Sequence, residues 1–317
     1  MKKIIFVVLI LFLGYLYIYP FFKNDHVKVK PLTKNYEKSK ILGSQVKPKK
    51  SIFIPYWTFG SERLEASEYD ELIYFGIAVD KNGIDLTDPG FAKLADFVNL
   101  SDSSKVRLLT VRIVDHNISA EVSRNKKLQE KIIRDSLSIA KEHDFDGIVL
   151  DFETASVAFD TVTQNISEFY KSYSESTKQQ KLLFYVTLYG DTYYKSRPYN
   201  VSLIGSYADS ILIMAYDFHK ARGNPGPNFP LKGRDIYGYD YAQMVSDFTQ
   251  DIDPQKLNII FGMFGYDWET DLENKAINNG VSSSLNSIKG KYIDSCVADK
   301  CNYSRDMKSF ETQVSYE

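Results

Sequence analysis

The sequence contains few of the residues that bind metals or form covalent cross-links. Its 317 residues include 2 cysteines and 4 histidines, and the histidines are far apart, at positions 26, 116, 143 and 219. No histidine or cysteine pair has the spacing of a metal site, so we expect no bound metal. Cys296 and Cys301 are close enough in the sequence to form a small disulfide loop outside the cytoplasm.

Positive charge is scarce outside the N-terminal segment. Residues 1–50 carry 11 of the 39 basic side chains and 2 of the 41 acidic ones, which leaves residues 51–317 with 28 basic and 39 acidic side chains. A domain with an excess of acidic groups repels the phosphate backbone of a nucleic acid. We therefore expect no nucleic-acid partner.

Charged residues are also absent from a long run at the N-terminus. Lys2 and Lys3 precede an apolar stretch over residues 4–22, close to the ~20 residues that a helix needs to cross a bilayer. No small-residue cleavage site is present, and three tyrosines and Phe21 are typical of a membrane interface. We favour an uncleaved transmembrane anchor over residues 1–22, with a cleaved signal sequence as the alternative.

A lysine-rich linker over residues 23–50 separates this anchor from the remainder of the chain. Its nine lysines would, by the positive-inside rule, keep the linker in the cytoplasm. The N-terminal tail, however, is short and basic like that of a signal sequence. We therefore expect a protein exported and tethered to the outer face of the membrane, or secreted if the N-terminus is cleaved.

Residues 51–317 alternate between strand-like and helix-like stretches, the pattern of a parallel α/β fold. Amphipathic helices are expected around residues 128–140 and 159–173. Seven buried strands are expected at Ser51–Tyr56, Leu72–Val79, Arg107–Ile113, Gly147–Glu153, Leu182–Tyr189, Ser210–Tyr216 and Asn258–Phe264.

This alternation predicts a (β/α)8 barrel of the TIM type. A doubly wound open sheet is the competing fold, but no glycine-rich phosphate turn follows the first strand. An eighth strand is missing, because the sequence after Phe264 is polar and loop-like, and only Thr312–Tyr316 resembles a strand. We expect a monomeric, C-terminally incomplete barrel with a gap between its first and seventh strands.

The stretch DFDGIVLDFET, residues 144–154, contains the strongest candidates for chemistry. Side chains alternate along a strand, so Asp151 and Glu153 share one face with Gly147 and Val149. That face points into the barrel, and the carboxyl end of a barrel strand is where such enzymes place catalytic groups. Two carboxylates in one lumen repel each other, which raises the pKa of one of them. The alternative is that both acids merely end a strand and meet solvent.

Three motifs in this order resemble those of glycoside hydrolase family 18, the chitinase-like family. DGIVLDFE resembles its signature, with Asp146, Asp151 and Glu153 in place and Val149 where the family has a further aspartate. ILIMAYDFH resembles the motif of the sixth strand, and FGMFGYDW resembles the seventh-strand segment of bacterial spore-cortex and chitinase-like members. The resemblance covers about residues 51–270, and it too implies a TIM-type barrel.

This resemblance implies a retaining mechanism in which the substrate assists its own cleavage. Glu153 would be the proton donor, the 2-acetamido oxygen of the sugar would be the nucleophile, and Glu153 would then activate water. Asp151 would orient the acetamide, and the hydroxyl of Tyr216 would hold it. The mechanism needs no cofactor, and it restricts the substrate to glycans that contain N-acetylglucosamine, with peptidoglycan preferred over chitin.

Other residues are assigned to sugar binding or to structure. The family motifs place Asp217 and Met214 beside the cleft, and Trp268 and Trp57 are candidates for stacking on a sugar, although either tryptophan could instead belong to the core. Asp146 and Gly147 are structural parts of the signature. The glycine- and proline-rich segment over residues 218–237 is expected to be a long loop at the mouth of the cleft.

Val149 leaves two functions open. Without the family's additional aspartate, Asp151 is expected to stay ionised throughout the cycle, in an enzyme of reduced activity. The alternative function is a carbohydrate-binding protein that keeps the cleft and has lost turnover. Glu153 favours the enzyme, because a binding protein needs no proton donor.

Overall fold

The chain divides into two units, Met1–Pro48 and Lys49–Glu317. The computed structural model describes residues 48–58, 66–154, 156–294 and 301–316, so the predicted anchor and nearly all of the linker lie outside the described residues. Within the described part, none of the helices combines the length and the apolar character that a membrane crossing requires. The architecture below is that of the second unit.

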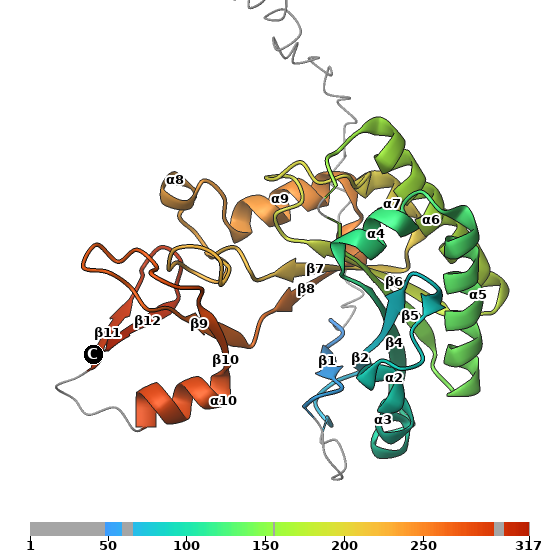
Figure 1. The fold of residues 1–317 in the computed structure, drawn as a ribbon, viewed down its shortest axis with the longest axis horizontal. Helices are drawn as coiled ribbons and strands as arrows, with labels where there is room; N and C mark the ends of the chain where they lie inside the picture. Colours follow the sequence, from blue (N-terminus) through green and yellow to red (C-terminus); the bar gives the residue numbers. More distant parts are fainter. Residues whose placement is uncertain (1–47, 59–65, 155, 295–300, 317) are drawn as a thin grey trace, which may run out of the picture. The chain divides into compact units, whose positions relative to one another are not determined.

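Seven parallel strands form one sheet in which neighbours in space are also neighbours in sequence. Residues rich in β-branched and aromatic side chains form each strand, and the strands curl into a half-barrel (Figure 1). A short strand, β3 (Gly83–Ile84), pairs antiparallel with β2. The parallel strands are, in order, β1 (Ser51–Pro55), β2 (Glu71–Asp80), β4 (Val106–Ile113), β5 (Gly147–Phe152), β6 (Leu183–Tyr189), β7 (Ser210–Ala215) and β8 (Leu257–Phe261).

Helices connect these strands, and α5, α6 and α7 lie along the outer face of the sheet (Figure 1). The two long helices occupy the positions that the sequence predicts, and each buries one apolar stripe. The helices are α2 (Pro89–Ala92), α3 (Leu94–Leu100), α4 (His116–Val122), α5 (Lys126–Glu142), α6 (Asp160–Gln179), α7 (Val201–Tyr207), α8 (Arg234–Tyr237) and α9 (Tyr241–Asp251).

The alternation of side chains along each strand divides the buried residues into two cores. Ile148, Leu150 and Phe152 of β5 belong to the large outer core beneath the helices. Val149 belongs to a small inner core. This inner core consists of Ile73, Leu108, Val149, Tyr185 and Leu212, one residue from each of β2, β4, β5, β6 and β7. The predicted orientation of β5, with its odd-numbered residues facing the lumen, is confirmed.

The sheet is open between its first and last strands. No described strand joins β8 to β1, so these two strands are the edges. Residues of β1 and β8 are mostly half-buried, whereas every residue of β5 and β7 is buried. The prediction of a TIM-type sheet that lacks its eighth strand agrees with this arrangement within the described residues.

The segment after β8 has more structure than its polar sequence indicates. It forms an antiparallel pair of β9 (Phe264–Asp267) with β10 (Val281–Ser284), and another of β11 (Cys301–Arg305) with β12 (Thr312–Tyr316). Short helical turns, α10 (Leu285–Ile288) and η2 (Lys289–Asp294), follow β10. The loop prediction was wrong here, because main-chain pairing stabilises strands whose side chains stay mostly exposed. The predicted strand at Thr312–Tyr316 exists, but it does not close the barrel.

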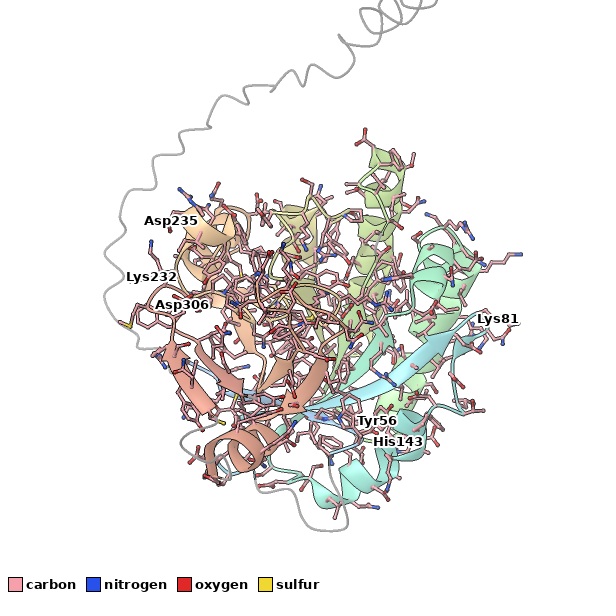
Figure 2. The ribbon with its side chains drawn as sticks, turned by 60° about the vertical axis from the view of Figure 1, so that its left-hand side comes forward. Tyr56, Lys81, His143, Lys232, Asp235 and Asp306 are labelled. Atoms are coloured by element: carbon pink, nitrogen blue, oxygen red, sulfur yellow. The ribbon has the colours of Figure 1, made fainter. Side chains whose placement is uncertain are left out.

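The β11–β12 hairpin is attached to the long loop that follows β7. Nζ of Lys308 lies 2.6 Å from Oδ2 of Asp235, and the hydroxyl of Tyr237 donates to Asp306. Figure 2 shows Lys232, Asp235 and Asp306 on the same side of the molecule. The predicted loop over residues 218–237 therefore ends in helix α8, and the hairpin supports it. Cys301, at the start of β11, is disulfide-bonded, while Cys296 lies outside the described residues.

Candidate active site

Two carboxylates lie on the lumen side at the carboxyl end of β5. Asp151 is the second-last residue of the strand and is 2% exposed, while Glu153 follows the strand and is partly buried. The backbone N–H of Glu153 donates to the carbonyl of Ile113 at 2.9 Å, which extends the β4–β5 pairing to this residue. Residues two apart on a strand are roughly 7 Å apart, so the two acids share one end of the lumen.

A residue of β6 holds Asp151 through a hydrogen bond, and the surroundings of Asp151 shift its pKa. The hydroxyl of Thr187 donates to Oδ1 of Asp151 at 2.5 Å. Burial and, next, the charge of Glu153 raise the pKa of Asp151 to about 7, although the Thr187 hydrogen bond and the positive charge of Arg112 oppose this. The expectation was that Asp151 stays ionised throughout the cycle, whereas a carboxyl with a pKa of about 7 is protonated in about half of the molecules at neutral pH.

Glu153 is also held from β6, through a tyrosine. The hydroxyl of Tyr189 donates to Oε2 of Glu153 at 2.5 Å. The guanidinium of Arg197 lies 3.6 Å from the centre of the Tyr189 ring and pairs with Asp191, with Nε 2.7 Å from Oδ1. Burial, followed by the charge of Glu153, raises the pKa of Tyr189 above its ordinary range. Tyr189 therefore remains a hydrogen-bond donor and fixes the carboxylate.

The end of β7 brings the other predicted residues to the same edge. Met214 is buried within β7, and Tyr216 and Asp217 follow it directly. Burial raises the pKa of Tyr216, and the charges of Asp151 and Glu153 raise it further. Tyr216 is thus within electrostatic reach of both acids and keeps its hydroxyl proton at neutral pH.

Asp217 is an aspartate in the left-handed region of backbone conformation, with φ of 60°. A non-glycine residue adopts this conformation only where neighbouring contacts fix it. Its N–H donates to Oδ1 of Asn228 at 2.7 Å, and its Oδ1 accepts from the hydroxyl of Tyr266 at 2.6 Å. Asp217 therefore links the end of β7 to strand β9.

Asp146 and Gly147 lie where β5 begins and contact the strands on either side. Oδ2 of Asp146 accepts from the backbone N–H of Arg107 at 2.8 Å, which joins the starts of β4 and β5. A Cβ atom at Gly147 would lie 2.6 Å from the backbone oxygen of Leu183 and 2.9 Å from Cδ2 of Leu108. Only glycine fits between the two neighbouring strands at this point.

The two tryptophans are not in direct contact with the carboxylates. Trp57 follows β1, is 61% exposed, and packs edge-on against Tyr56 at a centroid distance of 4.8 Å. Trp268 follows β9, and its ring lies 5.4 Å from that of Tyr266. Nε1 of Trp268 is buried without a hydrogen-bond partner among the described residues. Neither position tests the predicted stacking on a sugar.

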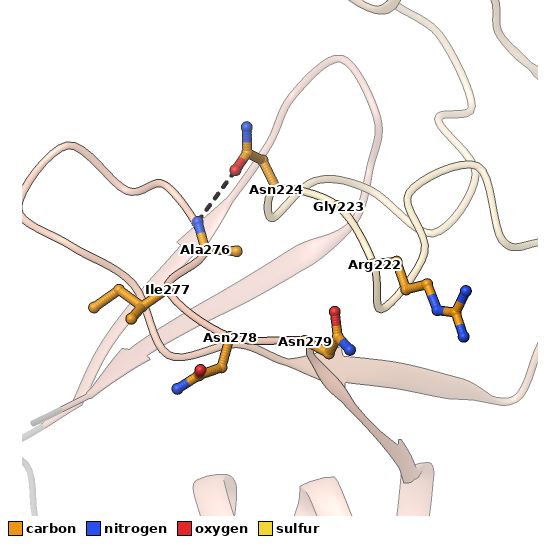
Figure 3. A pocket seen from close by; sticks show the side chains of 7 residues that line it. All are labelled: Arg222, Gly223, Asn224, Ala276, Ile277, Asn278 and Asn279. Atoms are coloured by element: carbon orange, nitrogen blue, oxygen red, sulfur yellow. Dashed lines mark hydrogen bonds between the residues drawn. The ribbon is translucent and has the colours of Figure 1, made fainter.

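A polar hollow of about 500 Å³ lies between the loop after β7 and the β9–β10 connection (Figure 3). Oδ1 of Asn224 accepts from the N–H of Ala276 at 3.1 Å and joins the two walls. Nδ2 of Asn278 donates to Oε2 of Glu269 at 2.7 Å, so this amide is already engaged. The hollow is lined by Arg222, Gly223, Asn224, Ala276, Ile277, Asn278 and Asn279. None of the predicted catalytic residues lines it, so the hollow is separate from the carboxylate site.

Val149, where the family signature has an aspartate, is fully buried in the inner core. Its register partners are Thr110 on β4 and Tyr185 on β6. Oγ1 of Thr110 is buried and has no hydrogen-bond partner among the described residues. The apolar side chain is therefore a packed part of the barrel interior and not an open position.

Three residues that contact or face the carboxylates were not predicted from the sequence: Thr187, Tyr189 and Arg112. All three are polar residues on the lumen side near the carboxyl ends of strands, a signal that was present in the alternation of β4 and β6. Their partners became evident only when the structure placed these strands beside β5.

Comparison with known proteins identifies the family of this fold and site. Residues 54–316 match the model of Glycosyl hydrolases family 18. The uncharacterized glycosylase YvbX of Bacillus subtilis is 26% identical over 161 residues, which are 49% of this chain and 44% of YvbX. A class V chitinase of Arabidopsis thaliana is 30% identical over 141 residues, 41% of this chain and 36% of the chitinase. The chain therefore spans less than half the length of either curated relative.

The fold is also that of a solved chitinase. The class V chitinase from Nicotiana tobaccum superimposes with a TM-score of 0.71 at 14% identity, covering 85% of this chain and 86% of the chitinase. At this identity the likeness concerns the fold alone. With the family match over residues 54–316, the chain belongs to glycosyl hydrolase family 18.

Proposed function

We propose that the protein hydrolyses β-glycosidic bonds in a polysaccharide containing N-acetylglucosamine, with retention of configuration and with the help of the substrate's own acetamido group. The observation that carries this proposal is the pair of carboxylates, Asp151 and Glu153, on the lumen side at the carboxyl end of β5. Barrel enzymes act at this edge, and a substrate-assisted glycosidase needs one proton donor and one group that orients the acetamide.

Each residue has a distinct step. Glu153 gives its proton to the glycosidic oxygen as the bond to the anomeric carbon breaks, while the acetamido oxygen bonds to that carbon. Asp151 accepts a hydrogen bond from the acetamide N–H and stabilises the positive charge of the resulting cyclic intermediate. The hydroxyl of Tyr216 donates a hydrogen bond to the acetamide oxygen. Glu153, now ionised, takes a proton from water, and the resulting hydroxide opens the intermediate.

The position of the proton before bond cleavage follows from this scheme. Asp151, with its pKa raised to about 7 by burial and by the charge of Glu153, is protonated in about half of the free protein at neutral pH. To stabilise a positive charge, Asp151 has to be ionised, while Glu153 has to be protonated. In the molecules that hold a proton on Asp151, binding of the sugar therefore has to leave Asp151 ionised and Glu153 protonated.

The polymer is proposed to be peptidoglycan, with chitin as the other candidate. A solved complex of the related tobacco class V chitinase contains NAG4, which supports a glycan built on N-acetylglucosamine. Both polymers carry the N-acetyl group that the mechanism requires, because the scheme contains no second nucleophile from the protein. The acetamide requirement excludes glycans without N-acetyl groups.

The direct test is to incubate the full chain with chitooligosaccharides and, separately, with purified peptidoglycan, and to identify the products by mass spectrometry. NMR of the first product should show the β-anomer, the configuration of the substrate. A Glu153→Gln preparation serves as the control for contaminating hydrolases. Products of equal yield from both preparations, or an initial α-anomer, would contradict the proposal.

A second candidate is a carbohydrate-binding protein without turnover. The apolar packing of Val149, fully buried among other lumen residues, favours this alternative, because it removes one carboxylate from the family pattern. Calorimetric binding of a chitooligosaccharide together with complete recovery of the intact sugar would support binding over hydrolysis.

We also propose that the protein is a monomer exported and tethered to the outer face of the membrane by residues 4–22. The proposal rests on the length of this apolar run and the basic residues before it. Protease treatment of intact cells should digest the folded domain, and deletion of residues 1–22 should leave it inside the cell. Protection in intact cells of the full chain would overturn the proposal.

A further inference from the structure

Arg112 lies beside the candidate catalytic carboxylates, on the strand next to theirs. It is the register partner of Asp151 across the β4–β5 pair, and neighbouring strands are about 4.8 Å apart. Leu108, four residues earlier on β4, belongs to the inner core. By the alternation of the strand, Arg112 therefore projects from the lumen side as well. The side chain of Arg112 is only 12% exposed.

Groups other than Asp151 hold the guanidinium in place. Nη2 lies 3.0 Å from Oδ1 and 2.8 Å from Oδ2 of Asp88, and Nε donates to the carbonyl of Gly76 at 3.2 Å. The rings of Tyr56 and Phe75 lie 5.2 and 5.5 Å away, within the range of cation–π attraction. The positive charge is therefore fixed in position before any ligand arrives.

Asp88 is itself anchored and nearly buried. Its Oδ2 accepts from the N–H of Gly90 at 2.9 Å as the N-cap of α2, and its side chain is 11% exposed. An ion pair with both partners desolvated contributes little net stability compared with apolar residues of similar size. The Arg112–Asp88 pair is better explained by the effect of the Arg112 charge on the neighbouring Asp151.

We propose that Arg112 is a positioning residue that supplies the fixed counter-charge for Asp151, and that Asp88 sets how much of this charge Asp151 experiences. The positive charge comes from β4, whose Arg112 is the register partner of Asp151. The role of Arg112 in turnover rests on the proposed function, whereas its electrostatic coupling to Asp151 does not.

The other groups that act on Asp151 have a different character. Glu153 is negative and opposes ionisation, and Thr187 donates one neutral hydrogen bond. The tyrosines from the surrounding elements that interact electrostatically with Asp151 stay protonated, because burial raises the pKa of each; they are Tyr170 of α6, Tyr199 before α7 and Tyr216 after β7. Arg112 is thus the cation that faces Asp151 among these described groups.

The test is a titration of the Asp151 carboxyl carbon by NMR in the full chain, assigned with an Asp151→Asn sample, and it requires no activity. Arg112→Gln should raise the pKa of Asp151 by about one unit. Asp88→Asn keeps the helix cap and leaves Arg112 without its neutralising partner, so it should lower the pKa. Arg112→Lys keeps the charge and should leave the pKa within a few tenths of a unit of wild type.

The two opposite directions separate electrostatic coupling from structural damage, which would move both variants alike. Lys81→Gln removes one exposed positive charge from the turn between β2 and β3 (Figure 2) and should leave the titration unchanged. If Arg112→Gln fails to fold, the Asp88→Asn and Arg112→Lys results decide. A rise in the pKa, or no change, in Asp88→Asn would overturn the proposal. Failure of the proposed function would instead leave these shifts intact while no sugar is cleaved.

Discussion

The hydroxyl of Tyr189 donates a 2.5 Å hydrogen bond to Oε2 of Glu153, from the last residue of β6 to the residue just after β5. The guanidinium of Arg197 lies 3.6 Å from the centre of the Tyr189 ring. Tyr189, itself fixed by Arg197, therefore holds the proposed proton donor. The orientation of the Glu153 carboxyl is set before a sugar binds. Such preorganisation is what a general acid requires.

Removal of this hydrogen bond should slow the chemical step. In Tyr189→Phe the Glu153 carboxyl becomes free to rotate, and we expect kcat on a chitooligosaccharide to fall by about tenfold to a hundredfold with KM little changed. Tyr193→Phe is the matched control, since that hydroxyl donates to Asp251 at 2.6 Å, a contact that includes neither carboxylate of the site. Equal effects of the two substitutions would show that Tyr189 acts through general stability.

Loss of the proposed acid should separate turnover from binding. Glu153→Gln keeps the shape of the side chain but cannot donate a proton in the same way, so we expect kcat to fall by about 10²–10⁴-fold. Binding of a chitooligosaccharide, measured by calorimetry, should persist. Unchanged hydrolysis would remove Glu153 from the mechanism, and equal loss of binding and turnover would assign it a structural role.

Asp151 should give the stability of the protein a specific pH dependence. Its pKa is raised from 3.8 to about 7 in the folded state, by burial first and then by the charge of Glu153. Between these two values the unfolded chain loses this proton while the folded chain keeps it, so the free energy of unfolding should decrease from pH 4 to pH 7 and level off above.

The size of this effect is up to about 4 kcal/mol. Urea unfolding of wild type and of Asp151→Asn at pH 4 and pH 8 measures it, because the asparagine variant lacks the titrating group and shares all others. The variant should lose less stability between the two values. Parallel pH profiles for the two proteins would show that Asp151 is not perturbed as proposed.

Restoring the aspartate of the family signature should destabilise the protein. Val149→Asp places a carboxyl in the apolar inner core, two residues from Asp151, and we expect a loss of about 2–5 kcal/mol in urea unfolding. Val149→Thr is the control, since it keeps the shape and adds a hydroxyl beside the unpartnered Oγ1 of Thr110. A stable and more active Val149→Asp would show that the lumen accommodates the charge.

The parallel strands and the orientation of β5 could be predicted because both depend on local patterns. Runs such as Ile148–Leu150 are apolar enough to be buried on both faces, and the period of two places Asp151 and Glu153 together. The antiparallel pairs after β8 could not be predicted, because β10 and β11 are polar strands that exist through pairing with β9 and β12.

The hydrogen-bond partners of the two carboxylates could not be predicted from the sequence. That Thr187 donates to Asp151 and Tyr189 to Glu153 depends on the register between β5 and β6, which no short motif encodes. The raised pKa of Asp151 depends on desolvation by the surrounding side chains. The sequence therefore identified the carboxylates but could not predict this shift.

The open side of the sheet has a consequence for how the protein behaves in solution. Strands β1 and β8 each present one row of backbone groups that no described strand pairs with, and Phe261 at the end of β8 is 59% exposed. Unpaired edges of this kind accept extended segments from other chains. Amide hydrogens along β1 and β8 should exchange with solvent sooner than those of β5, and crowded preparations should associate edge to edge, with turbidity that rises with protein concentration.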